Sequence, residues 1–182
     1  WAAGDRIVVG STNYNMDEAE ERRIVNITHD GAALSSTIIV DQPFTVLHFG
    51  VPQLFGSSDP ATQREIRQIA EVILLTRNVV VEGDPSSFNV GIGVSINIQT
   101  LRNAPDTYGR LSYIEIRNAG EKFAAGRNPI HFAKGGMSPQ SSIIGCSIHR
   151  SMNRGINLIG ASNITIRENV LYDITGNGIN FE

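Results

Sequence analysis

The sequence predicts an all-β fold, a right-handed parallel β-helix (solenoid), and three observations support this prediction. The 182 residues contain 23 Ile and 13 Val against 9 Leu, so β-branched residues are abundant. Turn-forming residues are also common, with 18 Gly and 15 Asn. Short apolar segments recur near the end of the chain at spacings of 22 to 26 residues. Because β-branched side chains suit pleated sheets and Gly and Asn suit tight turns, we expect many short strands joined by turns.

The expected strands begin near the start of the chain. Apolar runs with turn residues beside them predict strands over residues 5–10, 22–27, 37–40 and 78–81. Helical periodicity is confined to residues 62–75, where Ile66, Ile69 and Ile73 recur at spacings of three and four. We therefore expect one short helix near residues 62–72.

The repeats are clearest in residues 111–182. Aligning the chain with itself pairs residues 144–148 with 166–170, at an offset of 22. Residues 155–158 pair with 178–181 at an offset of 23, and residues 129–132 pair with the segment 26 residues later. Each repeat holds two short strands that cannot bury their apolar side alone, so the repeats must stack on one another. In this alignment, Ile148 lies directly above Val170 in the interior.

Other β architectures are less well supported by the turns. A sandwich or an antiparallel barrel requires hairpin signals such as Asn-Gly between alternating strands. Asn177-Gly178 is such a dipeptide, but it falls at the turn position of the repeat. No shift in composition marks a domain boundary, and residues 1–182 are predicted to form a single β-helix segment.

Composition excludes several classes of function. The 15 Lys and Arg are interspersed with 18 Asp and Glu, which predicts no basic face and no nucleic-acid partner. No run of 18 apolar residues is present, so we expect no membrane contact by this segment. The single cysteine, Cys146, excludes an internal disulfide and a multi-cysteine zinc site, and its apolar surroundings predict a buried thiol.

Several strings together resemble one family of extracellular proteins. They are WAAGDRIVV at residues 1–9, STNY at 11–14, EAEE at 18–21, LLTRNVVV at 74–81, GCSIH at 145–149 and NR at 153–154. The family carries a domain named for its eight glycines, and it includes fibrocystin-like proteins, the secreted cell-migration-inducing hyaluronan-binding protein and the transmembrane hyaluronidase. The resemblance implies a β-helix at the cell surface, and it implies that this chain is an internal fragment of a much longer protein.

The chain departs from the family at three positions. The resemblance implies histidines where Ala133, Ile159 and Asn177 stand, whereas His131 and His149 are kept. Alanine, isoleucine and asparagine have no titration near neutral pH, so family chemistry that depends on these positions would be lost.

Candidate chemical groups lie in the last repeats. Sugar-cleaving β-helices place carboxylates with Arg, Lys or His on the outward face of successive coils, and the residues that fit this pattern are His131, His149, Arg150, Arg154, Glu168 and Asp173. Two of them also have structural interpretations. Glu168 lies within a predicted strand and could simply face solvent, and Asp173 lies at a predicted turn and could cap its own backbone.

Metal and modification sites have weaker signals. His131 and His149 could share a metal with Glu168, but two histidines without a clear third ligand do not define a site. We expect no cofactor, and nothing in the sequence indicates calcium. Asn26 and Asn163 each begin an Asn-X-Thr triplet and are candidate N-glycosylation sites.

Two functions therefore remain open. The first is a structural or recognition segment of a large extracellular or cell-surface protein, which binds a glycan or other surface and matrix proteins. The alternative is a glycosaminoglycan-depolymerising enzyme of the hyaluronan-cleaving type, a hydrolase or lyase, or its inactive remnant.

Overall fold

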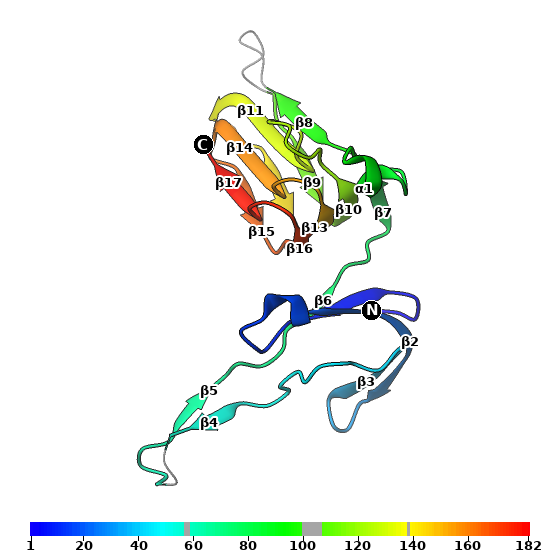
Figure 1. Cartoon of the computed structure of the whole chain (residues 1–182), viewed down its shortest axis with the longest axis vertical. Helices are drawn as coiled ribbons and strands as arrows, with labels where there is room; N and C mark the ends of the chain where they lie inside the picture. Colours follow the sequence, from blue (N-terminus) through cyan, green and yellow to red (C-terminus); the bar gives the residue numbers. More distant parts are fainter. Residues whose placement is uncertain (57–58, 100–106, 138) are drawn as a thin grey trace. The chain divides into compact units, whose positions relative to one another are not determined.

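The computed structural model describes residues 1–56, 59–99, 107–137 and 139–182. The chain divides into two compact units, Trp1–Leu74 and Leu75–Glu182. Regular structure in both units is almost entirely β (Figure 1). In the described ranges, helical structure amounts to the short helices η1 (Met16–Glu18) and α1 (Ser87–Val90). The prediction of an all-β fold is confirmed.

The first unit is antiparallel. Its larger sheet has the order β3-β2-β1-β6, and β4 pairs with β5 in a separate ribbon. These strands are β1 (Arg6–Val9), β2 (Glu20–Asp30), β3 (Ser35–Val40), β4 (Gln53–Phe55), β5 (Arg64–Ile66) and β6 (Val72–Leu74). The three strands predicted before residue 41 are present. Every pair in this unit is antiparallel, so the parallel pairing predicted for the whole chain does not extend to it.

The helix predicted near residues 62–72 is wrong. Its residues contribute to β5, and the following residues form β6, which pairs with β1 through Ile73 opposite Val8. Val8 is buried, so this pairing adds apolar burial to hydrogen bonding. β-branched isoleucines favour strands, and their helical spacing over so short a run is too weak a signal to decide against tertiary pairing.

A partly buried carboxylate, that of Glu20, ties the loop after β3 to the start of β2. Glu20 accepts hydrogen bonds from the backbone N–H of Thr45 (3.0 Å) and from its hydroxyl (2.8 Å). His48 Nε2 lies 3.0 Å from the same carboxylate, and Arg22 also binds it. Burial raises the pKa of Glu20, but these hydrogen bonds outweigh it and hold the pKa well below its usual range.

The second unit is built from three parallel sheets, with the orders β16-β13-β10-β7, β17-β14-β11-β8 and β15-β12-β9. The strands are β7 (Val79–Glu82), β8 (Ile96–Gln99), β9 (Arg110–Ser112), β10 (Ile114–Ala119), β11 (Ile130–Met137), β12 (Ser142–Ile144), β13 (Ser147–Ser151), β14 (Ile156–Ser162), β15 (Thr165–Arg167), β16 (Val170–Ile174) and β17 (Ile179–Phe181). From β9 onward, each successive set of three strands adds one strand to each sheet (Figure 1). The parallel pairing of successive repeats is therefore confirmed.

The register corrects one predicted alignment. Ile148 pairs with Ile116 in the preceding repeat, and it pairs with Leu171 and not with Val170 in the following one. Likewise, Ile143 rather than Ile144 pairs with Ile166. The offset of 22 is therefore wrong by one residue. It was ambiguous because two isoleucines are adjacent in the sequence, and only the buried partner, Ile143, faces the interior.

The other two offsets are confirmed by the pairs Ile156 with Ile179 and Ile130 with Ile156. The core of the second unit gathers inward side chains from all three sheets, including Ile116, Ile130 and Ile143. Cys146 lies in this core and is fully buried, as predicted.

Candidate ligand-binding site

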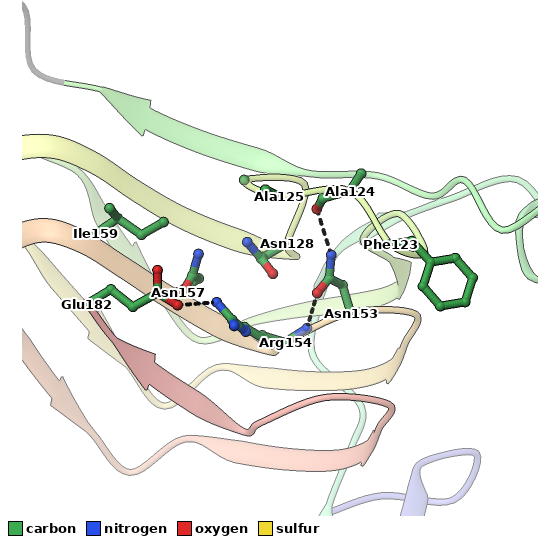
Figure 2. A pocket seen from close by; sticks show the side chains of 10 residues that line it. Phe123, Ala124, Ala125, Asn128, Asn153, Arg154, Asn157, Ile159 and Glu182 are labelled. Carbon is green, nitrogen blue, oxygen red and sulfur yellow. Dashed lines mark hydrogen bonds and ion pairs between the residues drawn. The ribbon is translucent and has the colours of Figure 1, made fainter.

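A cavity of about 340 Å³ opens on the second unit. Three segments line it (Figure 2): the loop of residues 123–128 between β10 and β11, Asn153 and Arg154 before β14, and the outward face of β14. Glu182, which follows β17, completes the lining. Three of the lining residues are asparagines, Asn128, Asn153 and Asn157, and the parallel stacking brings them together from two repeats.

The floor of the cavity lies beside a row of polar side chains. His131, Asn157 and Asn180 occupy the same register position in β11, β14 and β17. Successive residues of a strand point to opposite faces, so these side chains face away from the core that their neighbours Ile130 and Ile156 enter. The Asn157 amide lies 3.1 Å from His131 Nδ1, and Asn180 Nδ2 donates to Asn157 Oδ1 at 2.8 Å.

The loop of residues 123–128 covers part of this row. Gly126 has a φ of +74°, and a Cβ at this position would lie 3.3 Å from His131 Nε2. The left-handed backbone and the close approach both favour glycine here. His131 and Asn157 are consequently almost fully buried, although they project from the outward face of the sheet.

One side chain holds this loop in place. Asn153 Nδ2 donates to the carbonyls of Glu121 (2.8 Å) and Ala124 (2.9 Å), and the Asn153 side-chain oxygen accepts from the Arg154 N–H at 2.8 Å. Figure 2 shows Asn153 between the loop and Arg154. Both ends of this amide are therefore engaged with the backbone, which fixes the wall of the cavity before any ligand arrives.

The charged pair at the open side of the cavity is internally neutralised. Arg154 Nη1 lies 2.6 Å from Glu182 Oε1, and Asn180 Nδ2 donates to the same oxygen at 3.0 Å. The hydrogen bonds from Asn180 and Arg154 lower the pKa of Glu182, so this carboxylate is ionised at neutral pH.

Burial lowers the pKa of His131, against the opposing effect of its hydrogen bond with Asn157, and leaves the imidazole neutral.

Asn128 lines this cavity and carries a buried, unsatisfied acceptor. Its side chain is 1% exposed, and within the described residues its Oδ1 has no hydrogen-bond partner. Its backbone carbonyl, in contrast, accepts from the Ser95 hydroxyl at 2.6 Å. A buried acceptor left unpaired costs about 1–3 kcal/mol. Such groups are uncommon, and Oδ1 requires a donor that the described part of the protein does not supply.

The structure separates the predicted site residues. Arg154 lines the cavity, and His131 adjoins it through Asn157. His149 is fully buried in β13, in a different sheet, where its Nε2 lies 3.0 Å from Glu115 Oε1. The two histidines thus have separate partners. Across residues 1–56, 59–99, 107–137 and 139–182, no group of three or more His, Cys, Asp or Glu could hold a metal ion.

Glu115 is the centre of this second, buried polar group. It also accepts from Arg117 Nη1 at 3.1 Å and from the Arg77 backbone N–H at 3.3 Å. Burial raises the pKa of Glu115, but the His149 hydrogen bond, the Arg77 N–H and the nearby positive charges prevail and lower it to about 2. Complete burial and the contact of Nε2 with Glu115 indicate a structural role for His149.

Two further candidates, Glu168 and Asp173, are exposed, and each lies in a different type of secondary structure from the predicted one. Glu168 lies in the turn between β15 and β16 and not inside a strand, with a φ of +58° that matches Gly145 one repeat earlier. Asp173 lies inside β16 and not in a turn, with a φ of +53° that matches Arg150 in β13. Left-handed residues interrupt these repeats at fixed positions, a feature that hydrophobic periodicity does not report.

Two of the three positions where histidine was expected lie together. Ala133 pairs in register with Ile159, and Ile159 lines the cavity. Asn177 Nδ2 lies 3.4 Å from Asn180 Oδ1, next to the polar row. The positions at which the resemblance implies histidine therefore include one that lines the cavity and one next to the polar row.

Sequence reasoning missed Phe123, Asn128 and Asn157. A signal for Asn157 was present, because a polar residue recurs between two apolar ones in INI, IHF, INL and INF at residues 96–98, 130–132, 156–158 and 179–181. This repeated pattern marks a row of polar side chains on an outward face. Asn128 has no such signal, since its burial depends on how the loop folds.

Comparisons with known proteins confirm the predicted resemblance. Residues 97–182 match the family described as CEMIP beta-helix. The chain is 30% identical to mouse Fibrocystin-L, 28% identical to human cell surface hyaluronidase CEMIP2 and 28% identical to mouse cell migration-inducing and hyaluronan-binding protein, with 97% of the chain covered in each case. It spans 5%, 13% and 13% of their respective lengths. A search of the described residues finds no helix long and apolar enough to span a membrane.

Proposed function

We propose that the second unit is a segment of a right-handed parallel β-helix, and that residues 1–182 are one segment of a longer extracellular or cell-surface protein. Three sheets that each gain one strand per repeat support the β-helix, and parallel crossovers are right-handed in about 98% of cases. The names of the relatives, which include a cell surface hyaluronidase, support the location.

The function that the site supports best is recognition of a glycan by the cavity on the β8-β11-β14-β17 sheet. The observation that carries this proposal is the buried, unpaired Oδ1 of Asn128, a residue that lines the cavity together with two further asparagines and the Arg154–Glu182 pair. Sugar hydroxyls can donate to such an oxygen and accept from amide N–H groups. Relatives named for hyaluronan binding and hyaluronidase activity support a glycan ligand over a matrix protein.

Cleavage of a glycan has less support than recognition. Hydrolysis commonly uses two carboxyl groups on either side of the scissile bond, one of them protonated to act as the acid. Glu182 is the one carboxylate among the residues that line the cavity, and its lowered pKa keeps it ionised. Glu115 is buried with His149 and does not line the cavity. The enzyme alternative therefore lacks a second carboxyl group among the residues that line this cavity.

The two Asn-X-Thr triplets differ in their surroundings. Asn163 is exposed in the turn between β14 and β15, with a φ of +59°, whereas Asn26 is exposed within β2 and pairs with Ile39. A turn residue is more accessible to the glycosylation machinery than one in a paired strand. We propose that Asn163 is the glycosylated residue if the protein is secreted.

Isothermal titration calorimetry of the full chain against a panel of oligosaccharides tests glycan recognition. We expect at least one panel member to bind, and we expect Asn128→Ala to weaken that binding. Glu168→Ala is the matched control, because Glu168 is exposed in a turn and does not line the cavity. A folded chain that binds no oligosaccharide of the panel contradicts the proposal.

A further inference from the structure

We infer that the cavity takes a neutral saccharide in preference to a uronate, with Phe123 as the ring on which the sugar stacks and Asn128 as its buried acceptor. This inference rests on the proposed glycan recognition and specifies the class of sugar. Four features of the cavity carry it: an exposed ring, a fixed loop, a neutralised charge pair and an unmet acceptor.

Phe123 is the exposed ring. Its side chain is fully exposed (104%), and its backbone has a φ of +60°, a conformation that is unusual for a bulky residue. Figure 2 shows the ring projecting from the loop, away from the other labelled side chains that line the cavity. The C–H groups of a sugar can pack on the electron-rich face of such a ring.

The loop that carries Phe123 is held before a ligand binds. The N–H of Glu121 donates to the Arg127 carbonyl at 2.8 Å, which closes the loop on itself. The Asn153 amide adds its hydrogen bonds to the carbonyls of Glu121 and Ala124. A preorganised loop lowers the entropic cost of binding, so the position of the ring is set by the protein.

The charges at the cavity favour a neutral ligand. Arg154 is the cationic side chain among the lining residues, and Glu182 already neutralises it at 2.6 Å. The neighbouring cations of the loop are also engaged, since Lys122 lies over the Phe88 ring and Arg127 lies 3.9 Å from Glu121. A uronate carboxylate would have to displace Glu182 and would be repelled by it, whereas a neutral sugar leaves the pair intact.

The unpaired Oδ1 of Asn128 determines which polar group of the ligand is needed. The amides of Asn153 and Asn157 are already engaged with protein groups, whereas Asn128 Oδ1 lacks a partner within the described residues. A hydroxyl or an acetamido N–H supplies the missing donor, and a carboxylate supplies none. Two independent requirements, neutrality and a donor, therefore converge on the same class of ligand.

The test is calorimetric titration of the full chain with three tetrasaccharides at physiological salt. The probes are β-1,4-linked N-acetylglucosamine, β-1,4-linked glucose, and alternating glucuronate and N-acetylglucosamine. We expect at least one neutral probe to bind about tenfold more tightly than the uronate probe. Phe123→Leu, which keeps apolar bulk without a ring, should weaken neutral binding about tenfold, and Phe123→Trp should retain it. Tyr14→Ala is the control, because Tyr14 is equally exposed (103%) and lies in the first unit.

The outcomes distinguish failure of this inference from failure of the proposed glycan recognition. Tighter binding of the uronate probe, lost in Arg154→Gln, overturns the neutral preference and leaves glycan recognition standing. Neutral binding that Phe123→Leu does not change overturns the role of the ring. Failure of all three probes with chain shown to be folded by circular dichroism overturns the inference, and the wider panel described above then decides whether glycan recognition fails with it.

Discussion

The Nε2 atom of His149 lies 3.0 Å from the Oε1 atom of Glu115 inside the second unit, and both side chains are almost fully buried. The pair spans adjacent strands, since β10 and β13 align Arg117 with His149. Two residues that are distant in sequence thereby form one polar group with Arg117. Removing either partner leaves the other buried with fewer hydrogen bonds, which is more costly than removing both.

The buried carboxylate predicts acid sensitivity of the second unit. The folded pKa of Glu115 is about 2, below its ordinary value of 4.5, so it contributes stability that is present above pH 4.5. This contribution is lost as the pH falls from about 4.5 towards 2. Glu115→Gln should lower the free energy of unfolding at pH 7 by about 1–3 kcal/mol. It should also flatten the acid dependence measured by denaturant titration, whereas the exposed-site change Glu168→Gln should do neither.

The register predicts unequal effects of two adjacent isoleucines. Ile143 is fully buried, whereas Ile144 is partly exposed. Ile143→Ala should therefore cost about 2–5 kcal/mol as a buried large-to-small change. Ile144→Ala should cost clearly less in the same urea titration. Equal losses would show that the assigned strand phase is wrong.

The fully buried Ile148 provides a second test of the core. Ile148 pairs with Ile116 and Leu171 in the neighbouring repeats. Ile148→Ala is expected to cost about 2–5 kcal/mol in the free energy of unfolding. A measured loss below about 0.5 kcal/mol would place this side chain outside the packed interior.

The first unit should depend on His48. Its Nε2 lies 3.0 Å from Glu20, its Nδ1 lies 2.9 Å from the Gly10 carbonyl oxygen, and its ring meets Phe44 edge to face at 5.4 Å. His48→Phe keeps an aromatic ring but removes both polar contacts, so we expect a loss of about 1–3 kcal/mol. Hydrogen exchange of the β2 amides measures this loss. Unchanged protection in β2 would contradict the role given to His48, and His29→Phe at an exposed position is the control.

Glycosylation gives a test that is independent of ligand binding. After secretion from eukaryotic cells, peptide mass spectrometry should find a glycan on Asn163 at higher occupancy than on Asn26. The expected difference follows from the turn position of Asn163 and the paired strand around Asn26. Asn163→Gln should remove the corresponding mass. Higher occupancy of Asn26 would contradict the accessibility argument.

The sequence predicted the β class and the parallel repeats because their signals are local and repeated. Residues 130–132, 156–158 and 179–181 all place a polar residue between two apolar ones, and stacking makes that pattern visible three times. The one-residue error arose at Ile143 and Ile144, where hydrophobicity does not distinguish the buried residue from its neighbour. The pairing of this strand with the preceding repeat shows which of the two isoleucines faces the interior.

Other features depend on contacts between distant residues. Residues 72–74 form a strand because β1 is available to pair with them, and no local pattern contains that information. His149 was one of six candidate residues in the sequence, and its buried partner Glu115, 34 residues away in sequence, could not be predicted from local patterns. Nothing in the sequence distinguishes Asn128 from other loop residues, because its side-chain oxygen becomes buried only when the loop folds.

The most direct test of the central claim is nuclear magnetic resonance of the ¹⁵N-labelled chain titrated with the N-acetylglucosamine tetrasaccharide. If the cavity recognises a neutral glycan, the side-chain amide of Asn128 and the backbone amides of residues 123–128 should shift in proportion to occupancy. The amides around Glu168 and in β2 should stay in place. Saturating tetrasaccharide that leaves the Asn128 amide and the 123–128 loop unchanged, while shifting signals elsewhere or nowhere, would contradict the account.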